Sequence, residues 1–240
     1  MAWYLRQLSR VMRVLSDEEL ERLIPYLSER RFAPRQTLFA AGDPVDLVYL
    51  ILRGRVKVFQ VAENGKEIIV EIAGRGSIVG DMAIVENGER TATARALEDA
   101  VAVSISWSDF SHLVKRSPRL AFAMAELMAR RLANMQKSFA NVVSKPVSAR
   151  LAETLLSREG GGQIRLGLTH EELSQTIGTS RETVTALLSR FCALGAIRTA
   201  GEGLLLGDRD LLEAIAAGRV PVSPRHPRTS LSPGPALSES

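Results

Sequence analysis

The chain has few of the residues that build redox and metal sites: one cysteine, Cys192, and three histidines among 240 residues. A single thiol cannot close an intramolecular disulfide or hold an iron–sulfur cluster, which needs several cysteine ligands. His112, His170 and His226 lie in different segments, without a carboxylate or cysteine at a metal-ligand spacing, and we expect surface positions for them. We therefore expect no metal, haem or iron–sulfur cofactor.

Long apolar runs are also absent. No stretch approaches the roughly 18 consecutive apolar residues of a membrane span, and no basic segment followed by an apolar core opens the chain. We therefore expect a cytoplasmic protein with no membrane partner. No nucleophile, general base and oxyanion donor form a recognisable pattern, so an enzyme is not expected. The net charge of +4 suits a polyanionic partner but is weak support alone.

Residues 168–197, LTHEELSQTIGTSRETVTALLSRFCALGAI, predict two short helices joined by a tight turn. Thr169 and Glu172 form a capping box, in which the threonine oxygen accepts from a helix amide and the carboxylate reaches back to the cap. Gly178 suits a turn with positive φ, and Ser180 can cap the second helix. That helix has an apolar face, made of Val184, Leu187, Leu188 and Phe191, and Gly195 ends it.

Such a pair is typical of a helix-turn-helix, whose second helix enters the major groove of DNA at its first turn. Arg181 and Glu182 open that helix, where arginine can pair with guanine and glutamate can accept from the cytosine amino group. The alternative is a pair of ordinary surface helices. The candidate DNA-binding residues are Thr169, Ser180, Arg181, Glu182, Thr183 and Thr185.

A β-hairpin is predicted after Gly195, where two apolar runs flank a glycine turn, and it would form the wing of a winged helix. Asp208 or Asp210 can cap a last short helix. Near the N-terminus, Ser16 and Glu19 form another capping box in a short helical segment. Strands are predicted from about Arg31, because Val45–Val61, Glu67–Ile72 and Val101–Ile105 are rich in strand-forming residues. With recurrent glycines and the turn Glu63-Asn64-Gly65-Lys66, residues 31–117 predict a small antiparallel β-roll.

A long helix is predicted from Pro118 to about Val143. Steps of four and three alternate along it, the a/d pattern of a coiled-coil seam, at Ala121, Ala125, Met128, Leu132, Met135, Phe139 and Val142. We therefore expect a homodimer. The alternative is an amphipathic helix packed on its own β domain through a second stripe, Leu120, Met124 and Leu127, and one helix can do both.

The predicted fold class is therefore α+β, with an antiparallel β-roll, a long dimerisation helix and a winged helix-turn-helix. The expected parts are a helical lead (1–30), the β-roll effector domain (31–117), the dimerisation helix (118–145), the DNA-binding domain (146–218) and a disordered tail (219–240). The tail is rich in Pro, Ser and Arg and has too few apolar residues to offset the entropy of ordering.

A candidate anion site lies between residues 77 and 92 of the roll. Gly80 is followed by the acid Asp81, and Arg90 and Thr91 return nine residues later. Free amides, a guanidinium and a hydroxyl can surround a phosphate, while the carboxylate can accept from a ribose hydroxyl. The alternative is that Arg90 simply pairs with Asp81.

The winged-helix segment resembles the cAMP receptor protein and fumarate-nitrate regulator (CRP/FNR) family, in which Ser-Arg-Glu-Thr-Val opens the recognition helix, as residues 180–184 do here. The family's arginine four residues after the glutamate is replaced by Ala186, so an identical operator preference is in doubt. The resemblance extends through residues 10–217 and implies a DNA-binding transcription regulator, with RNA polymerase as a further partner if it activates.

The pocket resembles the phosphate-binding cassette of cyclic-nucleotide-binding domains, Gly-Glu-Leu followed by Arg-Ser-Ala. The resemblance places Arg90 and Thr91 on the cyclic phosphate, Gly80 at the close backbone approach and Asp81 in place of the ribose-binding glutamate. It puts Met135 and Gln136 where the cAMP receptor protein contacts adenine with a Thr-Ser pair.

Three outcomes stay open for the effector: cAMP bound through adjusted contacts, another cyclic nucleotide or small anion, or a vestigial pocket with constitutive DNA binding. A rival from another class is a nucleotide-binding regulatory subunit of an enzyme, in which the C-terminal helices contact protein. The Ser-Arg-Glu-Thr opening favours the homodimeric regulator on a two-fold symmetric operator.

Overall fold

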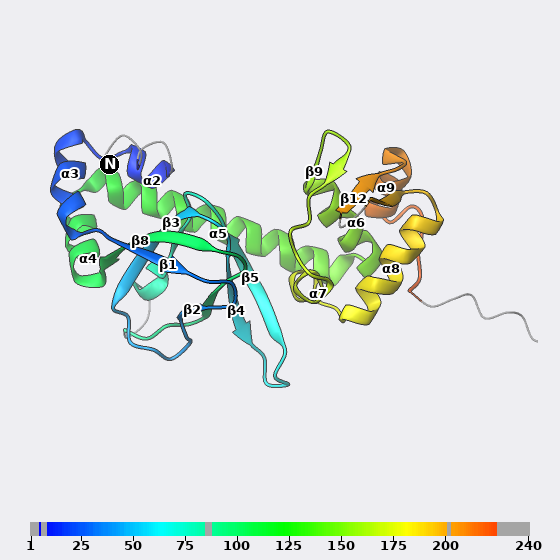
Figure 1. The fold of residues 1–240 in the computed structure, drawn as a ribbon, viewed down its shortest axis with the longest axis horizontal. Coiled ribbons are helices and arrows are strands. Elements are labelled where there is room, and N and C mark those ends of the chain that lie inside the picture. The colour runs from blue at the N-terminus through cyan, green and yellow to red at the C-terminus, as the bar shows by residue number, and fades with distance from the viewer. Residues whose placement is uncertain (1–4, 6–8, 85–87, 201–202, 225–240) are drawn as a thin grey trace, which may run out of the picture. The chain divides into compact units, whose positions relative to one another are not determined.

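The structure is a computed structural model that describes residue 5 and residues 9–84, 88–200 and 203–224. It divides into two compact units, residues 1–143 and 144–240 (Figure 1). Most of the expected C-terminal tail, with His226, lies outside the described residues. None of the described helices combines the length and the apolar character that a membrane span requires.

The first unit is built on two four-stranded antiparallel sheets, as the alternating pattern predicted (Figure 1). One sheet runs in the order β1 (Ser28–Phe32), β8 (Ala100–Ser106), β3 (Leu47–Arg53) and β6 (Ile78–Val79). The other runs in the order β2 (Thr37–Phe39), β7 (Thr93–Ala96), β4 (Val56–Val61) and β5 (Glu67–Ala73). The first strand begins at Ser28 rather than near Arg31, because residues 28–32 pair with β8 throughout.

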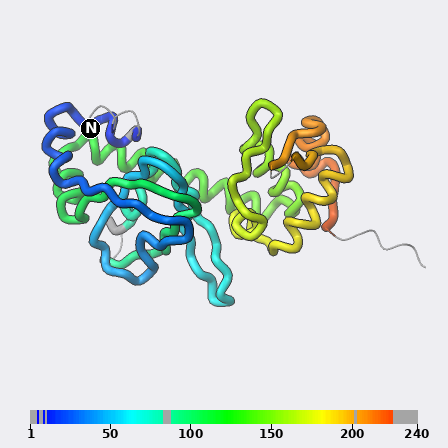
Figure 2. Tube along the Cα trace, in the orientation of Figure 1, coloured from blue at the N-terminus to red at the C-terminus, as the bar shows by residue number. Residues whose placement is uncertain are grey.

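Glycines make the corners between these strands. The chain passes from β3 to β4 at Gly54, which has a φ of +79° and lies where a Cβ would come 2.4 Å from the Asp99 carbonyl oxygen. Only glycine fits that position. The predicted turn around Gly65 closes the β4–β5 hairpin, and Figure 2 shows this hairpin extending beyond the other strands of the unit.

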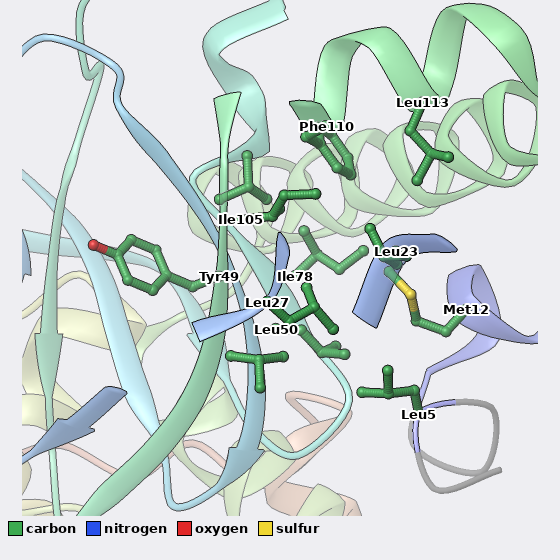
Figure 3. A pocket seen from close by; sticks show the side chains of 12 residues that line it. Leu5, Met12, Leu23, Leu27, Tyr49, Leu50, Ile78, Ile105, Phe110 and Leu113 are labelled. Atoms are coloured by element: carbon green, nitrogen blue, oxygen red, sulfur yellow. The ribbon is translucent and has the colours of Figure 1, made fainter. Parts of the chain in front are cut away.

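Two apolar cores stabilise the roll. One lies between the sheets and includes Ile51, Val56 and Ala94. The other joins the first sheet to the helices α2 (Arg10–Arg13), α3 (Asp17–Leu23), η1 (Ile24–Tyr26) and α4 (Trp107–Arg116). The predicted capping box of Ser16 and Glu19 opens α3. A cavity of about 20 Å³ lies in this second core. Figure 3 shows side chains that line it, and almost all of them are apolar. The cavity is far too small and apolar for a nucleotide.

The long helix α5 (Pro118–Ser144) has one face on this second core. Leu120 and Met124 are buried there and Leu127 packs beside them, so the stripe predicted for the β domain does cover it. Past Met128 the apolar seam positions are exposed: Leu132 by 58%, Phe139 by 73%, and Met135 and Val142 by similar fractions. Among the described residues of the first unit, no apolar core covers the distal part of the seam.

The second unit contains α6 (Val147–Ser157), α7 (His170–Ile177), α8 (Arg181–Ala193) and α9 (Arg209–Ala216) around one core. Its sheet runs in the order β11 (Ile197–Ala200), β12 (Gly203–Leu206), β10 (Gln163–Ile164) and β9 (Glu159–Gly160). Strands β11 and β12 form the predicted wing. Residues 160–162 form the turn of the short hairpin β9–β10. Asp208, the first of the two predicted caps, opens α9.

Candidate effector pocket and nucleic-acid interface

Arg90 is the centre of the candidate phosphate cassette and is only 5% exposed. Its Nη1 donates to the Gly80 carbonyl at 3.0 Å, and its Nη2 donates to the Leu47 carbonyl at 2.6 Å and to Asp46 Oδ1 at 3.0 Å. The guanidinium lies over the Phe39 ring, 4.1 Å from its centroid. Its Nε is buried and has no hydrogen-bond partner among the described residues. The Nε–H of this cation therefore lacks an acceptor in the part of the chain that the structure describes.

Gly80 lies against this guanidinium in a conformation that favours glycine. Its φ is +89°, and a Cβ there would come 2.6 Å from Arg90 Nη1. Any side chain at residue 80 would displace Arg90. Thr91 follows on the same segment, half-buried, and its carbonyl accepts from Gln60 Nε2 at 3.3 Å.

Asp81 opens the short 3₁₀ turn η2 (Asp81–Ile84), as expected, but it does not pair with Arg90. Its two carboxylate oxygens both accept from Arg131 Nη1 of α5 at 2.9 Å. Arg131 Nη2 donates to the Ile78 carbonyl at 2.6 Å, and Nε lies 3.1 Å from Glu71 Oε2 without a well-directed hydrogen bond. The suggested Arg90–Asp81 pair is therefore wrong, because each residue has a different partner.

Electrostatics in this Arg131 cluster (Arg131, Asp81 and Glu71) follow from burial of two acids beside one cation. Burial raises the pKa of Asp81, which is 1% exposed, and Arg131 opposes that shift. Burial likewise raises the pKa of Glu71, with Arg131 opposing it and Asp81 adding to it. Burial lowers the pKa of Arg131, but the two carboxylates outweigh that effect and the net shift is upward.

The helix pair of the second unit has the predicted caps. Thr169 Oγ1 accepts from the Glu172 amide at 3.2 Å, and the Glu172 carboxylate accepts from the Thr169 amide at 2.8 Å. Ser180 Oγ accepts from the Thr183 amide at 3.2 Å. Gly178 ends α7 with a φ of +68°. Each of these hydrogen bonds joins residues three apart in the chain. Because the partners are local, the sequence alone predicts them.

Arg150 of α6 fixes the turn between these helices. Its Nε donates to the Ile177 carbonyl at 3.0 Å and its Nη2 to the Gly178 carbonyl at 3.3 Å. Burial lowers the pKa of Arg150. Because the last carbonyls of a helix lack partners within it, this guanidinium holds α7 and the start of α8 in one geometry.

The candidate DNA-binding residues divide into two groups on these helices. Arg181, Glu182, Thr185 and Thr169 are exposed, whereas Ser180 and Thr183 are half-buried and their hydroxyls lie 3.1 Å apart at the start of α8. Thr185 Oγ1 donates to the Arg181 carbonyl at 3.0 Å and lies 2.9 Å from His170 Nδ1.

Sequence reasoning did not assign Asp46, Glu71, Arg131 or His170 to either site. The sequence holds no signal for Asp46 or Glu71, because their partners are distant in the chain. Arg131 gives no signal either, because Asp81 lies 50 residues away in the chain. Among the described residues, no three His, Cys, Asp or Glu side chains gather as a metal site would require.

Two family models match this chain: the cyclic nucleotide-binding domain at residues 29–117 and the Crp-like helix-turn-helix domain at residues 149–215. The cyclic AMP receptor protein of Thermus thermophilus is 31% identical over 206 residues, which are 85% of this chain and 95% of the relative. The chain belongs to the CRP/FNR family. It is a DNA-binding transcription regulator with a helix-turn-helix.

Two other proteins support this family assignment. The CRP-like cAMP-activated global transcriptional regulator of Mycobacterium tuberculosis is 32% identical over 189 residues, 75% of this chain and 84% of its own. A CooA mutant from Carboxydothermus hydrogenoformans superposes with a TM-score of 0.71 at 25% identity, covering 88% of this chain and 98% of CooA. Members of this family are transcription regulators, so the Thermus and Mycobacterium relatives give the enzyme-subunit alternative no support.

Proposed function

We propose that this regulator acts as a homodimer on a two-fold symmetric operator and that cAMP or a related cyclic nucleotide controls its operator affinity. Arg181 and Glu182 read base edges in this proposal, with Thr169, Ser180, Thr183 and Thr185 beside them. The nucleotide binds at Gly80, Asp81, Arg90 and Thr91. The names of the Thermus and Mycobacterium relatives, which refer to cAMP, support this class of effector.

The buried, incompletely bonded guanidinium of Arg90 is the observation that carries the effector proposal. A buried donor without an acceptor costs about 1–3 kcal/mol, which a bound anion would recover. Asp46, the carboxylate that now pairs with Arg90, is 69% exposed, so that pair stabilises the fold little. A cyclic phosphate carries one negative charge and only acceptor oxygens, and it can therefore replace Asp46 at low cost.

The ribose side of the pocket is more tightly closed. Because Arg131 binds both oxygens of Asp81, a ribose hydroxyl must share this carboxylate or displace the arginine. This supports a second candidate function, a regulator that binds its operator without an effector. In that case Arg131 would stay bonded to Asp81 and Asp46 would stay bonded to Arg90, and no ligand would displace either of them.

Thermal unfolding with cAMP and with cGMP separates the two candidates. A ligand that binds only the native state stabilises it by RT ln(1 + [L]/Kd), about 2.7 kcal/mol at a hundredfold excess over Kd. We expect one of the nucleotides to raise the melting temperature of the wild type and of Arg53→Leu, which removes an exposed arginine at the end of β3. Arg90→Leu should abolish the rise. No shift at millimolar ligand, with full operator binding, would favour the effector-independent regulator.

A further inference from the structure

Glu71, on β5, contacts a different nitrogen of Arg131 from the one that binds Asp81. Its Oε2 lies 3.1 Å from Arg131 Nε, whereas both oxygens of Asp81 accept from Arg131 Nη1 at 2.9 Å. The Glu71 side chain is 33% exposed, while that of Asp81 is almost completely buried. Glu71 is therefore the carboxylate of the Arg131 cluster that a molecule entering from solvent can reach.

The strand register places Glu71 on the inner face of its sheet. Val58 of β4 pairs with Glu71 on one side and with Ala94 of β7 on the other. Directly paired residues project to the same face of a sheet, and both Val58 and Ala94 pack in the core between the two sheets. Phe39, which carries the Arg90 guanidinium over its ring, belongs to the same core. The guanidinium of Arg90 and the carboxylate of Glu71 thus border one core.

Arg131 Nε supplies a hydrogen-bond donor next to this acceptor. The nitrogen is buried and has no hydrogen-bond partner among the described residues, because Glu71 Oε2 is near it but poorly aligned. A buried donor without an acceptor is unfavourable. The protein therefore presents one donor and one acceptor 3.1 Å apart. A purine base has the complementary edge, in which an N–H group lies beside a ring nitrogen or a carbonyl oxygen.

The order of these groups along the chain's contacts matches the order of the parts of a nucleotide. Arg90 Nη1 donates to the Gly80 carbonyl, Asp81 is the next residue, and Arg131 joins Asp81 to Glu71. In a nucleotide the ribose lies between the phosphate and the base. With the phosphate on Arg90 and the ribose at Asp81, as proposed above, the base is the part of the ligand nearest to Glu71.

We propose that Glu71 and the Nε–H of Arg131 bind the purine base of the effector and that Glu71 determines which bases the pocket accepts. An N–H of the base donates to the Glu71 carboxylate, and the neighbouring ring nitrogen or carbonyl accepts from Arg131 Nε. A base without an N–H at this edge sets its lone pairs against the carboxylate, so the pocket binds it more weakly. The inference rests on the proposed function, because it requires a cyclic nucleotide in the pocket.

The test measures the Kd of the full-length protein by calorimetry at about pH 8, so that the carboxylates are ionised. The probes are cAMP, cGMP and cyclic purine riboside 3′,5′-monophosphate, which keeps the cyclic phosphate, the ribose and the purine rings but has no N–H group on its base. We expect the wild type to bind cAMP or cGMP about tenfold or more tightly than this analogue, since a hydrogen bond to a charged group is lost with the analogue.

Substitution of Glu71 should change this ratio and not the general affinity. Glu71→Leu should weaken the preferred nucleotide to the level of the analogue and leave the analogue unchanged. Arg131 keeps Asp81 as its counter-charge in this variant, so the fold should survive, and Glu71→Ala makes the same comparison if it does not. Glu71→Gln keeps an acceptor oxygen and should retain most of the ratio. Glu67→Gln, on the same strand but bonded to Lys57 and Arg95, is the matched control and should keep the wild-type ratio.

The outcomes separate the role of Glu71 from the existence of the pocket. A loss confined to cAMP identifies the adenine edge and a loss confined to cGMP the guanine edge, and either supports the proposal. Equal weakening of all three nucleotides by Glu71→Leu, or equal affinity of the wild type for all three, would overturn it. Binding that depends on Arg90 with a ratio untouched by Glu71→Leu would overturn this inference alone. No binding of any of the three to the wild type would overturn the proposed effector function as well.

Discussion

At the scale of single residues, the Arg131 cluster places one buried carboxylate, Asp81, and one half-buried carboxylate, Glu71, beside one guanidinium. The raised pKa values of Asp81 and Glu71 mean that the folded state holds their protons more tightly than the unfolded chain does. This contribution to stability is fully present below the ordinary carboxyl pKa, about 4, and is lost as pH rises through the raised values. Arg131 limits the loss because it favours both ionised carboxylates.

Arg131→Leu should therefore destabilise the protein by about 3–5 kcal/mol at pH 7, because it leaves the buried carboxylate of Asp81 and the half-buried one of Glu71 without their cation. Acidification towards about pH 5 should recover part of the loss, since protonation removes the uncompensated charge. Chemical denaturation at the two pH values measures this. Arg130→Leu, at the exposed neighbouring position, is the control and should cost little at either pH. Equal losses at both pH values would show that Arg131 acts through packing rather than charge.

The role of a residue could be predicted from the sequence where its hydrogen-bond partner lies only a few residues away in the chain. Thr169 with Glu172, and Ser180 with the Thr183 amide, are three residues apart, and backbone geometry alone brings them together. Arg131 and Asp81 are 50 residues apart, and Arg90 and Asp46 are 44 apart. Their pairing depends on how α5 packs on the roll and on how residues 88–90 return beside residues 42–46, which no local pattern contains.

At the scale of elements, α5 has two apolar faces, of which one is buried in the first unit and the other is exposed. Leu120 and Met124 are buried in the first unit, whereas Leu132, Met135 and Phe139 are more than half exposed. Exposed apolar positions in an a/d pattern are stabilised by a second helix with the same pattern. The periodicity predicted both faces and the bounds of the helix, and a second copy of the chain packed on the distal face is the proposal made for it.

Leu132→Glu combined with Phe139→Glu should convert a dimer into monomers, because each places two like charges in a desolvated seam. Analytical ultracentrifugation measures the mass, and circular dichroism checks that the strands remain. Ala133→Glu together with Ala140→Glu, also exposed on α5 and seven residues apart but facing away from the seam, should leave the dimer intact. A double seam variant that sediments as an intact dimer would contradict the role given to this face.

At the scale of the whole molecule, one helix takes part in both proposed events. Arg131 of α5 binds the pocket acid Asp81, and the exposed seam lies further along the same helix. A nucleotide that competes for Asp81 would change the contacts that Arg131 makes for α5, and with them the packing of the seam. A change in the seam would in turn alter the distance between the two recognition helices of a dimer, which is about 34 Å in helix-turn-helix complexes. Ligand and operator would then bind with reciprocal linkage, each raising the affinity for the other by the same factor.

Operator affinity measured with and without saturating cAMP tests this account most directly, by fluorescence anisotropy on an operator selected from random DNA. The account predicts that cAMP tightens operator binding of the wild type about 5- to 150-fold, the usual range of such linkage, and leaves Arg90→Leu unchanged. The same operator affinity with and without cAMP in the wild type, at a concentration that saturates any binding seen by calorimetry, would contradict it.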